Sequence, residues 1–164
     1  MPDPGTEATA RPSLSDRTAV LVATLFGAGR VPFAPGTLAS AITAGVLALA
    51  PFTRGSLVLF FVVVTIGGIW ASHHAERVIG GKDPGAIVID EVAGMTLSVL
   101  AVPLTPAVLA VAFVLFRVFD VVKPFPAGRS QRIRGGVGVM IDDLIAGLYA
   151  LLVVWGLRRV LGWP

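Results

Sequence analysis

The sequence predicts an all-α protein, namely an integral membrane bundle of about four to five membrane-embedded helices built from helical hairpins. Two observations favour this fold class. Of the 164 residues, 55% are hydrophobic and only 14% are charged, and the mean hydropathy is +0.84, whereas soluble domains contain about 25% charged residues. The apolar residues also gather into runs, which short links join in pairs.

The chain begins with a polar, proline-containing segment of mixed charge, residues 1–16, which we expect to be a disordered tail. Residues 17–164 are then expected to form a single membrane-embedded domain. The tail lacks a basic segment directly followed by an apolar core, so it does not resemble a signal peptide. The apolar run 18–28 follows, with Ser15 and Asp16 as candidate N-caps. It is too short to span a bilayer alone, and we expect a half-helix or an interfacial segment.

The next apolar runs predict two helical hairpins. Runs 38–52 and 57–72 are joined by Thr-Arg-Gly-Ser, and runs 92–102 and 107–122 are joined by Pro-Leu-Thr-Pro; proline and glycine end helices. A last run, 144–157, is followed by two arginines. This pairing places both tight links on one side of the membrane and the longer, more basic segments on the other. The positive-inside rule makes the basic side cytoplasmic.

Five carboxylates adjoin the apolar runs, each at the predicted cytoplasmic end: Asp90, Glu91, Asp120, Asp142 and Asp143. Unpaired, they would together cost on the order of 10 kcal/mol in a membrane. A divalent cation is the simplest remedy, and oxygen-only ligands favour Mg²⁺. The chain has no cysteine and only two histidines, which makes a zinc site less favoured. We therefore predict a Mg²⁺ site among these five carboxylates.

Cationic residues lie close to one of these acids. Arg117, Asp120 and Lys123 follow each other at i, i+3 and i+6, which places them on one helix face. One interpretation is an ion pair that neutralises Asp120. The other is a phosphate clamp, in which arginine makes a bidentate contact and lysine supplies a point charge. Together with a Mg²⁺ site, these residues are typical of phosphoryl chemistry, and we expect all three to be catalytic.

Residues 31–40, Val-Pro-Phe-Ala-Pro-Gly-Thr-Leu-Ala-Ser, add a candidate anion site. Pro35 and Gly36 predict a turn, after which Thr37 is expected to be a helix N-cap. The free N–H groups of a helix N-terminus suit a phosphate. Simple capping of the helix by Thr37 is the alternative.

Three further features are less specific. The glycines ahead of Asp142 permit tight turns and close approach of the backbone to a ligand. His73 and His74 either cap the dipole of their helix or act in proton transfer or as a phosphoryl acceptor. The net charge of +3 is modest, and no basic patch is interleaved with aromatic residues, so nucleic-acid binding is not indicated.

Four motifs in combination resemble those of the bacterial phosphatidylglycerophosphatase A family: VPFAPGTLAS, DPGAIVIDEVAGM, FRVFDVVKPFP and GGVGVMIDDLIAG. Their order and approximate spacing match over roughly residues 29–150. The resemblance implies a helical, Mg²⁺-dependent phosphatase of the bacterial inner membrane, multi-pass and with its active site facing the cytoplasm. Such enzymes remove the terminal phosphate of phosphatidylglycerol phosphate, a phospholipid substrate, to give phosphatidylglycerol.

The same resemblance implies site residues. It places Asp90 with Glu91, and Asp142 with Asp143, in two acid pairs of the family. Further positions match its basic–acidic helix motif and its phosphate-binding turn: Arg117, Asp120, Lys123, Thr37 and Ser40. Ala39 stands where members commonly have glycine, which adds a methyl group beside Ser40. His73 falls where members often have histidine.

The expected mechanism is hydrolysis by water that Mg²⁺ activates, with Asp90 and Asp142 as ligands and with Glu91 and Asp143 binding the metal or orienting water. Arg117 and Lys123 would neutralise the phosphoryl oxygens, and Asp120 would be a third ligand or the base. A covalent phospho-aspartate intermediate is the alternative.

Two other functions are open from the residues alone. The first is a small membrane transporter that moves cations or protons through clustered carboxylates. The second is a non-catalytic membrane subunit. All five acids lie toward one face, which disfavours the transporter. The convergence of Arg117, Lys123 and Thr37 with the acids disfavours the subunit.

Overall fold

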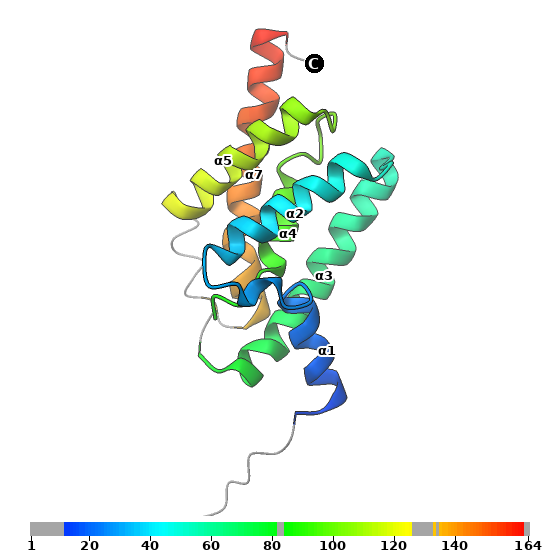
Figure 1. Ribbon diagram of the computed structural model, residues 1–164. Helices are drawn as coiled ribbons and strands as arrows, with labels where there is room; N and C mark the ends of the chain where they lie inside the picture. The colour runs from blue at the N-terminus through cyan, green and yellow to red at the C-terminus, as the bar shows by residue number, and fades with distance from the viewer. Residues whose placement is uncertain (1–11, 82–83, 126–132, 134, 163–164) are drawn as a thin grey trace, which may run out of the picture.

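The computed structural model describes residues 12–81, 84–125, 133 and 135–162. In these residues all regular secondary structure is helical, which confirms the predicted all-α class for the described part of the chain. Six α-helices and one 3₁₀ turn follow each other (Figure 1): α1 (Leu14–Ala23), η1 (Ala28–Arg30), α2 (Pro35–Leu49), α3 (Arg54–Ile79), α4 (Ile89–Leu97), α5 (Pro106–Val122) and α7 (Gly136–Leu161).

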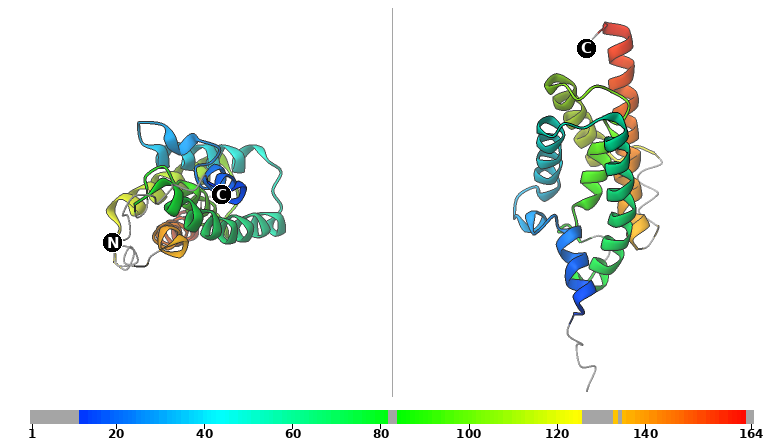
Figure 2. Two further views of the ribbon diagram at one scale, coloured as in Figure 1. Left: turned by 90° about the horizontal axis from the view of Figure 1, so that it is seen from below. Right: turned by 90° about the vertical axis from the view of Figure 1, so that its right-hand side faces the viewer.

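The short helix α4 is the centre of the bundle. It packs against α2, α3 and α7, while α7 also packs against α3 and α5. Seven of the nine α4 residues are buried, so this helix needs apolar neighbours on several sides. Consequently the first predicted hairpin is open: α2 and α3 are consecutive, but α4 lies between them (Figure 2, right).

The two ends of the molecule differ. The links 50–53 and 98–105 lie at one end together with the C-terminal end of α7, and the loops 24–34 and 84–88 lie at the other (Figures 1 and 2). Arg54 joins the two links, because its guanidinium donates a hydrogen bond to the carbonyl of Leu100. The tight links thus share one end, as the sequence predicts.

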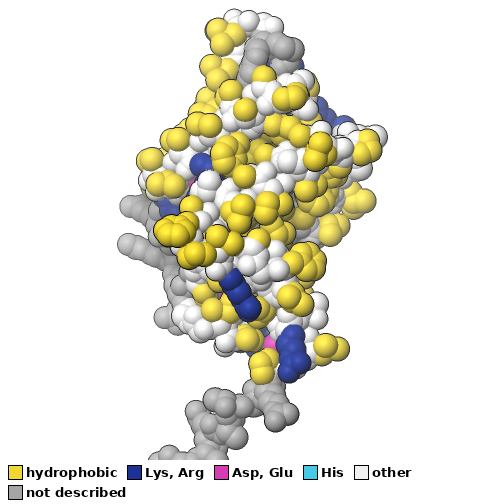
Figure 3. All heavy atoms as spheres, viewed as in Figure 1, with side chains coloured by type: hydrophobic (Ala, Val, Ile, Leu, Met, Phe, Trp, Pro, Cys, Tyr) yellow, Lys and Arg dark blue, Asp and Glu magenta, His cyan; other side chains and the backbone are white. Residues whose placement is uncertain are grey.

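Two of the described helices, α3 and α7, are long and apolar enough to cross a membrane, with mean hydropathies of 2.0 and 2.1. The apolar helix α2 has 15 residues and α4 has nine, so both are shorter than the roughly 20 residues of a span. Hydrophobic side chains cover most of the face shown in Figure 3. Large exposed apolar residues are frequent along α3: Val58, Leu59, Val62, Val63 and Ile66. These features fit membrane association.

The first helix begins before the predicted end of the tail. Residues 1–11 lie outside the described residues, but α1 already includes Leu14, Ser15 and Asp16. The N-cap is Ser13 rather than Ser15 or Asp16, because a capping box forms there. The Ser13 hydroxyl accepts from the Asp16 backbone N–H, and the Asp16 carboxylate accepts from the Ser13 N–H, both at 3.1 Å. The Ser13 hydroxyl also donates to Asp16 Oδ2 at 2.8 Å, and this hydrogen bond, together with the one from the Ser13 backbone N–H, holds the pKa of Asp16 below its ordinary value.

Candidate active site

Three carboxylates from two helices meet inside the bundle. Asp90 and Glu91 stand in the first turn of α4, where the helix dipole favours negative charge. Asp143 approaches them from α7. Oxygen atoms of the three side chains lie within 4.8 Å of one another. Asp90 and Asp143 are only 7% and 3% exposed. We call Asp90, Glu91 and Asp143 the acid cluster.

The carboxylate oxygens of the acid cluster are suitable ligands for a divalent cation. Glu91 Oε2 and Asp143 Oδ2 are buried, and neither has a hydrogen-bond partner among the described residues. Buried carboxylates that lie this close repel one another and lack the hydration that they would have in water. A hard cation that prefers oxygen ligands would remove both penalties, and Mg²⁺ or Ca²⁺ is of that kind.

Asp142 does not join the acid cluster. It is 4% exposed, and its carboxylate contacts the ammonium of Lys123. Consecutive residues of an α-helix project about 100° apart, so Asp142 and Asp143 face different neighbours. The structure thus divides the four predicted metal ligands into a group of three and one carboxylate that pairs with a lysine.

The predicted basic and acidic residues of α5 form an ion-pair chain beside the acid cluster. Arg117 Nη1 lies 2.7 Å from Asp120 Oδ2 and 3.8 Å from Glu91 Oε1. Lys123 Nζ lies 3.9 Å from Asp120 Oδ1. The ion pairs of Asp120 are therefore present, and Arg117 also reaches the acid cluster through Glu91.

An unusual backbone conformation positions Lys123. It is the C-cap of α5 and has φ +47°, in the left-handed region that non-glycine residues seldom adopt, and Pro124 follows it. From there its side chain reaches Asp142 on α7. Burial lowers the pKa of Lys123, but the hydrogen bond to Asp142 and the nearby carboxylates outweigh burial and raise it above its ordinary value. Lys123 is therefore cationic at neutral pH.

The first turn of α2 faces this region, but Thr37 is not its N-cap. The helix begins at Pro35, a residue that suits the first helical position, and Ala34 with φ +45° is the N-cap. The prediction of a cap at Thr37 is therefore wrong. Thr37 instead lines a surface groove together with Arg117.

Gly36 is a site residue whose role the sequence analysis missed. A Cβ at this position would lie 1.9 Å from Glu91 Oε1 and 3.2 Å from Nη1 of Arg117, so glycine allows α2 to approach the acid cluster. The sequence held no signal for this role, because Pro35-Gly36 suggests a turn and only the structure shows that α2 begins at Pro35. Ser40, one turn later, is fully buried, and its hydroxyl donates to the Gly36 carbonyl at 2.8 Å. The hydroxyl proton of Ser40 is therefore engaged in a hydrogen bond within α2.

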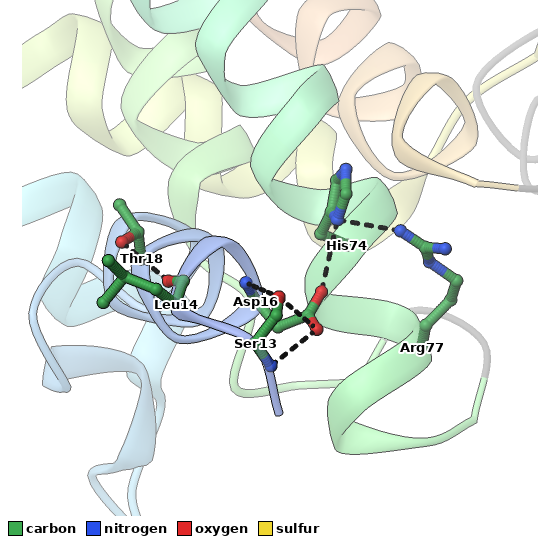
Figure 4. Close-up of polar contacts among 6 residues, drawn as sticks. All are labelled: Ser13, Leu14, Asp16, Thr18, His74 and Arg77. Carbon is green, nitrogen blue, oxygen red and sulfur yellow. Dashed lines mark hydrogen bonds and ion pairs between the residues drawn. The ribbon is translucent and has the colours of Figure 1, made fainter. Parts of the chain in front are cut away.

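The two histidines contact other residues. His74 Nδ1 lies 3.4 Å from Asp16 Oδ1 and 2.8 Å from Arg77 Nη2 (Figure 4). The contact with Asp16 joins α3 to α1, whereas Arg77 lies on α3 itself. His73 is exposed. Because α3 continues to Ile79, neither histidine lies in its last turn, where a residue that caps the dipole would stand.

Comparisons with known proteins agree with the motif resemblance. Residues 21–158 match the family model described as Phosphatidylglycerophosphatase A. A Bacteroides thetaiotaomicron protein, provisionally named phosphatidylinositol-3-phosphatase, is 41% identical over 155 residues, which cover 87% of this chain and 95% of the relative. Phosphatidylglycerophosphatase A of Escherichia coli is 35% identical over 153 residues (88% and 84%), and that of Haemophilus influenzae is 35% identical over 143 residues (84% and 87%). No solved structure matches the chain.

Proposed function

Because the chain belongs to the phosphatidylglycerophosphatase A family, we propose that it is a membrane phosphatase that hydrolyses phosphatidylglycerol phosphate to phosphatidylglycerol and phosphate. The observation that carries this proposal is the acid cluster with Arg117 beside it and Lys123 close by. Carboxylates that can hold a divalent cation, next to fixed cations, are the groups that phosphoryl transfer requires. A carboxylate-based transporter is not favoured, since it would leave the family resemblance unexplained.

In this proposal the cations of the chain hold the phosphate. The Nε atom of Arg117 is buried and has no hydrogen-bond partner among the described residues, so it is available to a phosphoryl oxygen. Lys123 supplies the second positive charge. Asp142 positions that lysine rather than binding metal.

Asp120 is the proposed base. Water attacks phosphorus and gives a proton to Asp120 as the bond from phosphorus to the glycerol oxygen breaks. That oxygen takes up a proton from solvent, and Asp120 then returns its proton to solvent. Arg117 Nη1 lies 2.7 Å from Asp120 Oδ2 and orients that carboxylate.

We also propose that Asp90, Glu91 and Asp143 hold Mg²⁺. When bound, this ion would lower the pKa of water and offset the negative charge of the phosphate. The ligand set thus contains three of the four acids that the sequence predicts.

The proposed setting is the bacterial inner membrane, crossed several times, with the acid cluster toward the cytoplasm. Both α3 and α7 can span by length and composition. The substrate is then a phospholipid whose acyl chains stay in the bilayer.

Phosphate release from purified protein tests the proposal. We expect turnover of phosphatidylglycerol phosphate, loss of turnover in excess chelator, and recovery with Mg²⁺. Asp143→Asn should be inactive although folded. Phosphatidylinositol 3-phosphate, which the name of the Bacteroides relative suggests, and phosphatidic acid are the comparison substrates. Faster turnover of either would replace the proposed substrate, and full activity in chelator would contradict the metal proposal.

A further inference from the structure

A groove runs between the first turn of α2 and the outer face of α5. Its volume is about 420 Å³, within the roughly 300–1,000 Å³ of small-molecule sites. Six of its seven lining residues lie on α5: Thr37, Phe113, Val114, Arg117, Val118, Val121 and Val122.

The lining residues form two adjoining stripes of α5. Val114, Val118 and Val121 recur at i, i+4 and i+7 and are 58%, 48% and 73% exposed, so they form an outward apolar stripe. Phe113 and Arg117 lie on the neighbouring stripe. Asp120, which does not line the groove, continues that stripe inward at the same spacing. The groove is therefore continuous with the apolar outer surface of the molecule on one side and with the proposed active site on the other.

Arg117 is the one charged residue among the seven that line the groove. Its side chain is 19% exposed, and its guanidinium contacts Asp120 and lies 3.8 Å from Glu91 of the acid cluster. Thus a ligand that enters from the apolar surface meets a cation at the point where the groove reaches the acid cluster.

We propose that this groove holds an acyl chain of the lipid substrate, with the phosphate at Arg117. The inference rests on the proposed function, since it assumes a lipid phosphate monoester. Such a molecule has an apolar chain joined to an anion. The groove matches this order, because valines line its outer part and Arg117 lies at its inner end. A water-soluble phosphate ester would gain nothing from the exposed valines.

A substitution that fills the groove tests the proposal. We compare Val118→Trp with the matched control Leu59→Trp, which lies on α3 and is 64% exposed. The measured quantity is the ratio of kcat/KM for long-chain phosphatidylglycerol phosphate to kcat/KM for its water-soluble headgroup, glycerophosphoglycerol phosphate. Val118→Trp should lower this ratio about tenfold or more, because loss of a few methylene contacts has this effect. The control should leave it unchanged. An unchanged ratio in Val118→Trp, including equal loss with both substrates, would overturn the proposal.

Photo-crosslinking of the wild-type protein gives a readout that does not need turnover. Vesicles of phosphatidylcholine carry a tracer of phosphatidylglycerol phosphate or of phosphatidylcholine, each with a diazirine on the acyl chain. The phosphate monoester should label residues 113–122 in excess of the phosphatidylcholine tracer, and Arg117→Gln should abolish the excess. Equal labelling by both tracers would overturn the proposal. Specific labelling without hydrolysis would instead refute the proposed function and retain the groove as a lipid site.

Discussion

The ammonium group of Lys123 contacts Asp142 on α7 and lies 3.9 Å from Asp120 on its own helix. Such a lysine can neutralise a buried acid, bind a phosphate, or do both. The contact with Asp142 establishes the first role, whereas the second is a proposal. Stability and turnover separate the two roles, because the ion pair affects folding whereas a phosphate contact affects only the reaction.

The Lys123 pair gives the first prediction. Lys123→Gln should lower the free energy of unfolding by about 1–3 kcal/mol, because it leaves the carboxylate of Asp142 buried without a counter-charge. The double variant with Asp142→Asn should regain most of this loss, measured as the thermal midpoint in detergent. Turnover should nevertheless remain roughly 10²–10³-fold below wild type, since the contact with the phosphate is still missing. Near-wild-type turnover in the double variant would show that the lysine is structural alone.

Gly36 gives the second prediction. Gly36→Ala adds a Cβ that would lie 1.9 Å from Glu91 Oε1, so Glu91 must move within the acid cluster. A displacement of about 1 Å can lower turnover roughly 10²-fold. The matched control is Gly45→Ala, on the same helix and in open space, which should retain full turnover. Equal turnover in the two variants would show that the close approach of α2 is not needed.

At the level of elements, the position of α4 depends on glycines in the helices that it contacts. A Cβ on Gly147 would lie 2.3 Å from the carbonyl oxygen of Gly94, so α4 and α7 touch through their backbones. Gly147 is one helical turn after Asp143, on the same face. The contact that brings the two helices together therefore also brings Asp143 to Asp90 and Glu91.

This contact gives the third prediction. Gly147→Ala should force α4 and α7 apart, since the opposing atom is backbone and cannot rotate away. We expect a loss of about 1–3 kcal/mol, typical of overpacking, together with a large loss of turnover. Gly156→Ala, which lies on the same helix and in open space, is the control and should preserve both. The measurements are the thermal midpoint and phosphate release, and unchanged values for Gly147→Ala would show that the backbone contact with α7 does not position α4.

The sequence predicted the bounds of individual helices better than it predicted which helices pack together. Apolar runs and proline or glycine breaks locate α2 and α5 to within about three residues at each end, because those signals are local. The predicted run 57–72 identifies α3, but the helix continues through polar residues to Ile79. The packing of α4 against α2 and α3, and its backbone contact with α7 at Gly94 and Gly147, join residues far apart in the sequence, which no local pattern encodes. The site shows the same contrast between local signals and contacts between helices. The acids beside apolar runs include every carboxylate of the candidate site. The separation of Asp142 from Asp143, however, depends on which helix each side chain faces. The start of α2 at Pro35 was missed because Ala34 adopts a left-handed conformation that its residue type does not favour.

At the scale of the whole molecule, the two ends are chemically unlike. One end has the tight links, which Arg54 joins through Leu100, and the other has the longer loops near the acid cluster. Helices α3 and α7 connect these ends. If both cross the bilayer, the links and the acid cluster face opposite compartments, and the lipid phosphate must be presented from the side of the longer loops.

This arrangement gives the fourth prediction, on topology. The chain contains no cysteine, so single introduced cysteines report their own position only. Lys82 and Ser130, on the basic segments of the sequence, lie outside the described residues, whereas Arg30 and Gly55 are described and exposed. Arg30→Cys lies on the loop before α2 and Gly55→Cys lies at the start of α3, where no other atom approaches within 4 Å. A membrane-impermeant maleimide should label Arg30→Cys only in inside-out vesicles and Gly55→Cys only in right-side-out vesicles.

The cysteine-free wild type is the control for background labelling, and phosphate release by each variant confirms that its fold is intact. Labelling of both cysteines from the same side would show that the two ends of the bundle do not face opposite compartments, and it would contradict the proposed placement of the acid cluster.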